Sequence, residues 1–406
     1  MISSKRRIYL DHAATTPVRD DAIAAMMPHL GTYGFNPSSL HAEGRTARAA
    51  LDGARASVAH VLGARPREIV FTGGGSEADN LAIIGAARAR RRAGRGDRVV
   101  TVATEHRAVL HATDALRGEG FTVEVLPVDA EGRVDVARFE AALLPRTALA
   151  TVMLANNELG TLQPVAALAR IAHDCGVTFH TDAVQAPGRV TLDVDALGID
   201  MLALSAHKFY GPKGVGALYV RSGTPLEPLV VGGGQELGLR AGTENVAGIV
   251  GFARALELAA TELPAEAARL ATLRDRLEVG IQKTVRGVRF NGAGAERLPS
   301  ITSVAFEGTD ARALLISLDL AGVACSQGSA CAAGAAEPSH VLAAIAAPAW
   351  AEAGTLRLSL GKLTTEEDVE AVLEMLPSVV AAARDDGRAL GTSHFGSLSS
   401  RAEVRS

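Results

Sequence analysis

Short apolar runs alternate with longer alanine-rich stretches from about residue 65 to residue 220 of this chain. The short runs have the composition of buried strands, and the longer stretches carry apolar residues at helical spacing. This alternation is typical of an α/β layer in which helices cover a mainly parallel sheet. We expect strands at 68–72, 98–103, 122–126, 149–154, 178–180, 201–204 and 216–220, and helices at 78–92, 165–175 and 247–263.

The pattern changes after about residue 263, which indicates a second and smaller α+β unit. A chain of 406 residues, 48% of them hydrophobic, is long enough for two cores. The last helix is expected to begin with Thr364 as N-cap and Glu367 three residues later. Other elements expected in this unit are a helix at 264–285 and strands at 300–306 and 356–359. The predicted units are a large domain at 17–262, a small domain at 263–384 that the N-terminal segment 1–16 joins, and a mobile polar tail at 385–406.

Charge and cysteine content exclude several classes of function. The formal net charge of −4 offers no field that would attract nucleic acid or an anionic membrane surface. The three cysteines, an odd number without Cys-x-x-Cys spacing, argue against a disulfide framework and a structural zinc site. The N-terminus has only Ile8, Tyr9 and Leu10 as an apolar run, which is too short for a signal peptide. We expect a cytoplasmic protein with no membrane span, no metal and no direct nucleic-acid contact.

Lys208 lies in the stretch SAHKFYGPKG, directly after the apolar run that ends at Leu204. Most lysines in such loops are solvated. A lysine held at a strand end and partly desolvated has a lowered pKa and becomes an amine nucleophile. Ligands of open α/β sheets bind outside the carboxyl ends of the strands, so the neighbouring strand ends decide between the two interpretations.

A glycine-rich segment, GGGSE, follows the strand expected at 68–72. Glycines let the backbone approach a ligand closely, and the amides of Gly74 and Gly75 with the Ser76 hydroxyl form an anion site. The spacing does not match a nucleotide P-loop. The alternative is that Ser76 only caps the next helix, with Asp79 completing a capping box.

Further polar residues follow other strands of the same sheet. Asp182 ends an apolar strand, Gln185 follows three residues later, and His106 and Asn157 end two more strand segments. Each alone has an ordinary structural explanation, such as an ion pair for Asp182. Together with Lys208 they would surround a planar, anionic, nitrogen-containing ring with a phosphate arm. Pyridoxal 5′-phosphate (PLP) fits, because its aldehyde needs a lysine and its pyridinium nitrogen a carboxylate.

With these motifs assembled, the chain resembles the cysteine desulfurases, in the aminotransferase class V branch of fold-type I PLP enzymes. The resemblance covers about residues 8 to 375 and rests on motifs in the family's order. The motifs are YLDHAATTP, FNPSSLHAEGR, FTGGGSEADNLAI, TEHRAVL, NNELGTLQPV, HTDAVQAPG, SAHKFYGPKGVGALYVR, GGGQELGLRAGTENVAGIVGF, CSQGSACAAGAAEPSHVL and LRLSLG.

The resemblance implies a role for each matching residue. Lys208 would bind PLP covalently, Asp182 would pair with its ring nitrogen, and His106 would stack on the ring. Gln185 would bond the phenolic oxygen of the ring. The phosphate ligands would be Gly74, Gly75, Ser76, Ser205, His207 and, from a second subunit, Thr243, which implies a homodimer. Arg357 and Asn157 would hold the substrate carboxylate; without the resemblance, Arg357 would read as a surface strand arginine.

Cys331 distinguishes this family from ordinary aminotransferases. It lies in CSQGSACAAG, a stretch of small residues typical of a flexible loop, where a thiol can be reached. The implied reaction converts L-cysteine to alanine and leaves the sulfur on Cys331 as a persulfide for an acceptor protein. Cys325, which replaces a small hydroxylated residue of the family, reads as a packed strand-end residue, and Cys175 as core. Leu237 stands where an arginine is common, which puts in doubt a contact near the dimer or substrate entrance.

Two other functions remain open on sequence grounds. A selenocysteine lyase or another class V aminotransferase would keep the lysine and aspartate without needing Cys331. A non-catalytic partner would keep the fold as a scaffold for sulfur-transfer proteins. The acceptor is equally open, since an iron–sulfur scaffold, a tRNA-thiolating enzyme and a dedicated cofactor pathway all fit the sequence.

Overall fold

A computed structural model describes residues 7–328 and 339–393 of the chain. Its central element is a seven-stranded sheet in which β8 runs antiparallel to both of its neighbours. The strands in spatial order are β2 (Ile69–Thr72), β8 (Gly216–Val220), β7 (Met201–Ser205), β6 (Thr178–Asp182), β5 (Thr147–Thr151), β3 (Arg98–Val102) and β4 (Thr122–Leu126). The predicted α/β fold with a mainly parallel sheet is confirmed, and each predicted strand lies within three residues of its observed ends.

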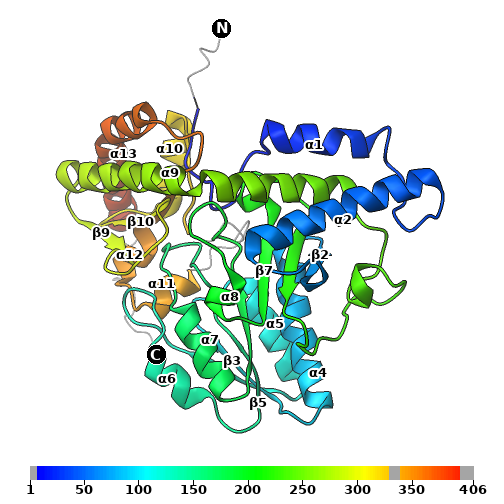
Figure 1. The fold of residues 1–406 in the computed structure, drawn as a ribbon. Helices are drawn as coiled ribbons and strands as arrows, with labels where there is room; N and C mark the ends of the chain where they lie inside the picture. The colour runs from blue at the N-terminus through cyan, green and yellow to red at the C-terminus, as the bar shows by residue number, and fades with distance from the viewer. Residues whose placement is uncertain (1–6, 329–338, 394–406) are drawn as a thin grey trace, which may run out of the picture.

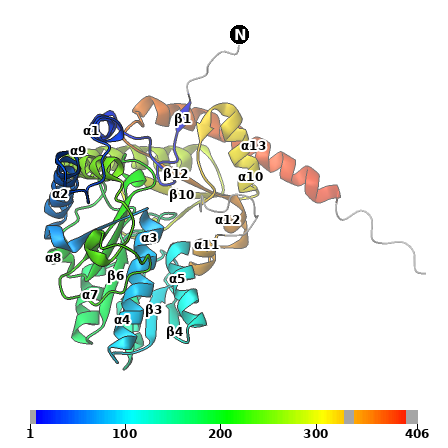
Figure 2. The ribbon, with the colours of Figure 1, turned by 90° about the vertical axis from the view of Figure 1, so that its right-hand side faces the viewer.

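Helices cover both faces of this sheet, as Figure 1 and Figure 2 show. One layer consists of α2 (Ala42–Leu62), α6 (Val136–Ala142), α7 (Val165–Asp174), α8 (Val194–Leu197) and the first half of α9 (Val246–Thr284). The other layer consists of α3 (Gly75–Asn80), the π-helical turn η2 (Leu81–Gly85), α4 (Ala86–Arg92) and α5 (Arg107–Gly118). The sheet is therefore buried on both sides.

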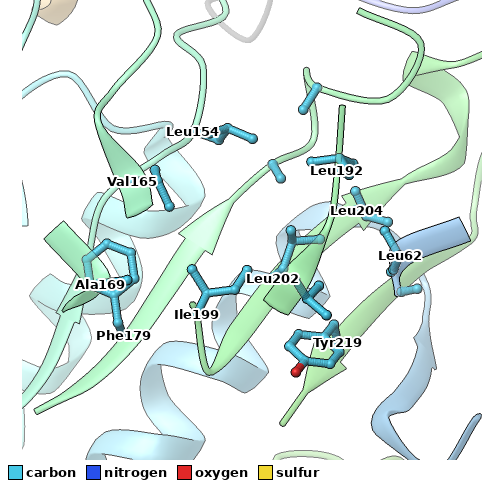
Figure 3. Close-up of a cluster of buried hydrophobic side chains, with 14 of the residues drawn as sticks. Leu62, Leu154, Val165, Ala169, Phe179, Leu192, Ile199, Leu202, Leu204 and Tyr219 are labelled. Carbon is cyan, nitrogen blue, oxygen red and sulfur yellow. The ribbon is translucent and has the colours of Figure 1, made fainter. Parts of the chain in front are cut away.

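Strand β7 shows how burial on both faces of the sheet favours an apolar strand. Leu202 and Leu204 pack against one helix layer, where Figure 3 places Leu202 beside Ile199 and Leu204 beside Leu62. Met201 and Ala203 pack against the other layer. Because water reaches neither face, the strand has no polar alternation, and its polar residues are confined to its ends.

A second core surrounds an antiparallel sheet with the order β12 (Thr355–Ser359), β10 (Ile301–Phe306), β9 (Val288–Asn291). The second half of α9, α10 (Ala311–Ala321) and α13 (Glu366–Ser393) pack on this core. The short helices α11 (His340–Ala344) and α12 (Ala349–Gly354) form a smaller cluster beside it. A parallel pair joins β1 (Ile8–Tyr9) to β11 (Val323–Ala324), so the N-terminal segment lies against this part of the chain. Helix α1 (Asp20–Leu30) packs along α9.

Helix α9 replaces the two helices predicted on either side of Pro264. It runs continuously from Val246 to Thr284 past both sheets (Figure 1), so the predicted domain boundary at 262/263 falls inside it. Proline cannot bond to the carbonyl of Ala260, but Ala260 is exposed and water can take the place of the lost donor. Neither α9 nor any other helix within residues 7–328 and 339–393 is both long and apolar enough to cross a membrane.

The start of α13 differs from the prediction by one residue. The Thr365 hydroxyl accepts a bond from the Asp368 amide (3.2 Å), and the Asp368 carboxylate accepts one from the Thr365 amide (3.0 Å). This reciprocal pair is a capping box, while Thr364 bonds the Gly361 amide instead. At the other end, residues 385–393 of the predicted tail form the last turns of α13 (Figure 2), and 394–406 lie outside the described residues.

Candidate active site

A cavity of about 350 Å³ lies at the carboxyl ends of β5, β6 and β7, where the sheet's polar residues are found. The N-terminal segment and β12 also line the cavity, so it sits between the two cores. Ten residues predicted from the sequence line it: Gly75, Ser76, His106, Asn157, Asp182, Gln185, Ser205, His207, Lys208 and Arg357.

Lys208 is half-buried at the end of the 3₁₀ turn η3 (Ala206–Lys208), which follows β7 directly. The chain then turns back, and a side chain at Gly211 would come within 2.7 Å of Ala206 Cβ, so this turn requires glycine. The Lys208 ammonium donates to the carbonyls of Ala13 (2.7 Å) and Ala14 (2.8 Å). The alternative of a solvated loop lysine is therefore wrong, because the amine is held inside the cavity.

Asp182 is the last residue of β6 and is almost fully buried. Its carboxylate accepts a bond from the Val184 amide (2.9 Å). Burial raises the pKa of Asp182, while His106, the Val184 amide and Lys208 act in the opposite direction. Asp182 also lines the cavity, so a cationic group of a ligand bound there would lie beside this carboxylate.

The glycine-rich segment forms a close backbone approach at one end of the cavity. Gly74 adopts φ 153° and ψ −179°, a conformation restricted to glycine. A Cβ on Gly75 would lie 2.8 Å from the Val184 side chain, and one on Gly216 would lie 2.6 Å from the Gly74 backbone. Helix α3 has no side-chain cap, so the capping role considered for Ser76 and Asp79 is wrong, and the Ser76 hydroxyl faces the cavity.

Ser205 and His207 lie beside this cradle, at the end of β7 and in η3. Burial, followed by the charges of Lys208 and Lys213, lowers the pKa of His207 to about 4. The His207 ring, which is 3.1 Å from the Thr15 hydroxyl, is therefore neutral at physiological pH. A neutral imidazole and a hydroxyl can each donate a hydrogen bond to an anionic group, and neither adds a positive charge beside Lys208.

His106 and Gln185 occupy the middle of the cavity. His106 is the N-cap of α5, and its Nδ1 accepts a bond from the Ala108 amide (3.2 Å). Gln185 donates from Nε2 to the Ala13 carbonyl (2.9 Å), whereas its buried Oε1 has no partner among the described residues. An unpartnered buried amide oxygen marks a position where a ligand donor is missing.

Arg357 projects from β12 and is 1% exposed, so the alternative of a surface strand arginine is wrong. Its guanidinium donates to the Asn157 carbonyl (2.9 Å) and to the Asp11 carboxylate (2.8 Å), and Nε has no partner among the described residues. No sequence pattern links Asp11 to Arg357, which is 346 residues away. The remaining N–H groups of Arg357 can bind a second carboxylate from the cavity side.

Two more acids that the sequence analysis did not assign to the site lie next to Asp182. Asp79 lines the cavity from α3, and Glu105 is fully buried where β3 leads into α5. Burial is the largest cause that raises the pKa of each carboxyl well above its usual range, and the charge of Asp182 adds to it. Both carboxyls therefore favour the protonated form more strongly than an exposed acid does.

We expect Glu105→Gln to flatten the pH dependence of stability. Because the pKa of Glu105 is raised in the folded protein, the folded state binds more protons than the unfolded chain once the pH exceeds about 4.5. Wild-type stability therefore falls as pH rises, by up to about 1 kcal/mol per pH unit for this group. Glutamine keeps an acceptor for the Met153 amide, which bonds Glu105 Oε1. Urea unfolding from pH 5 to pH 8 measures the slope, and equal slopes would contradict the assignment.

Three predicted site residues are not among those that line the cavity. Gly74 precedes the lining residue Gly75 and makes the close approach to Gly216. Thr243 is described but exposed, on the segment before α9. Cys331 lies outside the described residues.

The other two cysteines have different environments. Cys325, directly after β11, is largely buried, and burial is the main cause that raises its pKa to about 12. This agrees with a packed strand-end residue, because such a thiol is almost never ionised. Cys175 is exposed at the C-cap of α7, so its assignment to the core was wrong. The helix ends one residue earlier than predicted, which leaves the thiol outside the packed face.

Both the sequence and the fold of this chain are similar to those of known proteins. Residues 8–372 match the family model described as aminotransferase class-V. The chain is 46% identical over 376 residues to a protein of Dictyoglomus turgidum named cysteine desulfurase IscS, covering 93% of this chain and 95% of that one. A solved structure titled NifS-like protein is similar with a TM-score of 0.87 and 36% identity, covering 93% of this chain and all of the other. A structure titled SspA in complex with cysteine has a TM-score of 0.77 and 38% identity, covering 87% and 98% of the two chains.

Proposed function

The chain belongs to the aminotransferase class-V family, and on that premise we propose that it is a PLP-dependent cysteine desulfurase. It converts L-cysteine to L-alanine and transfers the sulfur to Cys331 as a persulfide. The observation that carries this proposal is the meeting of three groups in one cavity: the Lys208 amine, the buried Asp182 carboxylate and the buried Arg357 guanidinium. These are the groups that an aldehyde, a pyridinium and an amino-acid carboxylate require.

The residues present fit PLP. The glycine cradle with Ser76, Ser205 and His207 suits its phosphate, and the unpartnered Gln185 Oε1 suits its phenolic oxygen in the protonated state. When bound, the cofactor supplies an electron sink for the bond that breaks at the substrate Cα. Asp182 provides the negative charge that holds a proton on the ring nitrogen.

The chain's own groups account for the remaining chemistry. Arg357, held in place by Asp11 and the Asn157 carbonyl, binds the substrate carboxylate with its free N–H groups. The Lys208 amine, once free, takes the proton from the substrate Cα. The Cys331 thiolate forms a bond to the substrate sulfur as the bond from that sulfur to Cβ breaks. The carbon skeleton keeps the electron pair of the broken bond, takes up protons at Cβ and Cα and leaves as alanine. The persulfide sulfur then passes to an acceptor protein.

Product analysis tests this function. Wild-type protein supplied with PLP, L-cysteine and a thiol reductant should release alanine and sulfide in equal amounts. Amino-group transfer to an oxo acid without sulfide would instead support an aminotransferase. A protein that fails to bind PLP would support a scaffold. Borohydride reduction followed by peptide mass spectrometry should place the cofactor on Lys208.

We expect Arg357→Lys to lower kcat/KM for L-cysteine by about 100-fold, mainly through KM. Lysine keeps the charge that pairs with Asp11 but loses the planar fork that can bind a second carboxylate. Arg297→Lys is the matched control, because Arg297 makes a largely buried ion pair with Glu278 outside the cavity. Steady-state kinetics measure both variants, and equal losses would show that the effect is structural.

A homodimer, with Thr243 entering the partner's cavity, is part of the proposal. Leu40, Val231 and Leu237 are 90%, 78% and 56% exposed, on the segment after α1 and around the turn η4 (Glu236–Gly238). The ion pair between Arg55 and Glu236 (2.6 Å) fixes that turn. Exposed apolar groups of this kind mark interaction surfaces, and Thr243 lies on the same segment. Sedimentation should give twice the mass of the chain.

The acceptor and the compartment complete the proposal. The acceptor is a protein such as an iron–sulfur scaffold or a tRNA-thiolating enzyme, and the protein acts in the cytoplasm, where thiols stay reduced. A persulfide carrier needs such a compartment, because an oxidised Cys331 could not attack the substrate sulfur.

A further inference from the structure

Four buried polar side chains on one side of the cavity have no role in the chemistry above. Asp79, Glu105 and His180 each have one polar side-chain atom without a hydrogen-bond partner among the described residues: Oδ1, Oε2 and Nε2. All three side chains are at most 1% exposed. The fourth, Thr151, lies on the neighbouring strand β5 and contacts His180. Unpartnered polar atoms are costly inside a protein, and they gather here beside Asp182.

Three of these side chains, Thr151, His180 and Asp79, form a line that leads to Asp182. The Thr151 hydroxyl lies 2.9 Å from His180 Nδ1, and His180 Nε2 lies 3.7 Å from Asp79 Oδ1. One side-chain ligand atom each of Asp79, His106 and Asp182 lies within 4.8 Å of the others. Asp79 is thus placed between the imidazole of His180 and the carboxylate of Asp182.

The charges along this line follow from burial. Burial lowers the pKa of His180 to about 3, so the ring is neutral and carries one proton. When the Thr151 hydroxyl donates to Nδ1, that proton lies on Nε2, facing the unpartnered Oδ1 of Asp79.

The acids of this region cannot all be ionised. Burial and a negative charge on Asp182 both raise the pKa of Asp79 and of Glu105. A negative charge on Glu105 would raise the pKa of Asp79 further. Asp182 is the acid whose pKa is lowered by His106, by the hydrogen bond from the Val184 amide and by Lys208. The negative charge therefore resides on Asp182, while Asp79 and Glu105 are neutral acids.

We propose that Asp79 is a positioning residue: as an uncharged acid oriented by His180 and Thr151, it donates a hydrogen bond to the Asp182 carboxylate. This bond orients Asp182 and stabilises it as the anion. A stabilised anion is a weaker base, so the shared proton stays on the ring nitrogen of the cofactor. The inference rests on the proposed function, because it assigns the ligand of Asp182 as the PLP ring.

Two substitutions of Asp79 separate its donor role from its charge. Asp79→Asn keeps a neutral donor toward Asp182 and an acceptor toward His180, whereas Asp79→Leu removes both. With PLP labelled with ¹⁵N in the ring, the nitrogen signal should be that of a protonated pyridine in wild type and Asp79→Asn. In Asp79→Leu it should move toward the neutral value, and the dissociation constant of PLP should rise by about 10-fold or more.

A second pair keeps the test decisive if Asp79→Leu does not fold. Thr151→Val removes the hydroxyl at the far end of the line, away from the ligand, and should shift the ring-nitrogen signal in the same direction by a smaller amount. Thr181→Val is the matched control, since Thr181 is equally buried on β6 but donates to the Val152 carbonyl instead. It should leave the signal unchanged.

Three outcomes would overturn the inference. An unchanged signal and affinity in Asp79→Leu would show that Asp79 does not act on Asp182. Equal damage in Asp79→Asn and Asp79→Leu would show that Asp79 acts through its charge. Equal effects of Thr151→Val and Thr181→Val would show that Thr151 does not act on Asp79 through His180. If instead wild type does not join PLP to Lys208, the proposed function itself fails.

Discussion

Lys208→Ala should lower the rate of alanine production from L-cysteine by about 1,000-fold or more. The same amine is both the group that binds PLP and the base that takes the Cα proton, so one substitution removes two contributions. The structure holds this amine in the cavity through the Ala13 and Ala14 carbonyls, and Lys208→Ala removes that donor from both, although Gln185 still donates to the Ala13 carbonyl. Turnover and the absorption spectrum of the reconstituted protein measure the effect.

Lys213→Ala is the control for Lys208→Ala. Lys213 lies five residues later in the same loop and is exposed, so its loss removes a nearby positive charge without touching the cavity lining. We expect near wild-type turnover from this variant. If Lys208→Ala kept a substantial rate, or if borohydride labelled another lysine, the assignment of the amine would be wrong.

Strand positions were predictable because burial on both faces imposes a strong composition. The runs at β2, β7 and β8 are almost entirely apolar and fully buried, and the structure places each where the sequence indicates. The polar residues at the ends of these strands could also be identified from the sequence. Helix boundaries were less predictable: Pro264 lies inside α9 because the exposed carbonyl of Ala260 can bond water.

The residues missed in the site depend on contacts that chain spacing does not encode. Asp79 follows Ser76 at the spacing of a capping box, and only the packing of α3 beside β6 brings it close to Asp182. Asp11 is far along the chain from Arg357 and reaches it because the N-terminal segment pairs with β11 and β12. Local pattern rules identify the strand ends but not the partners that meet there.

Cys331→Ser should lower alanine release from L-cysteine by about 1,000-fold or more and abolish the persulfide. Serine has nearly the same shape, but its hydroxyl is not ionised at neutral pH and cannot take up sulfur. PLP binding should be unchanged, because the residues that fit PLP belong to the sheet edge. Mass spectrometry of the protein after brief exposure to L-cysteine detects the added sulfur. An aminotransferase would lose nothing by this change.

The other two cysteines are matched controls for Cys331→Ser, and each excludes a different explanation. Of these two cysteines, Cys325 is the nearer to Cys331 in the sequence. Burial raises its pKa to about 12, so it cannot replace Cys331 as a thiolate. Cys175 is exposed, but it lies between α7 and the start of β6, at the opposite end of the strand from Asp182. Cys325→Ser and Cys175→Ser should each keep turnover and persulfide. If either abolished the persulfide while Cys331→Ser did not, the sulfur would be carried by that cysteine.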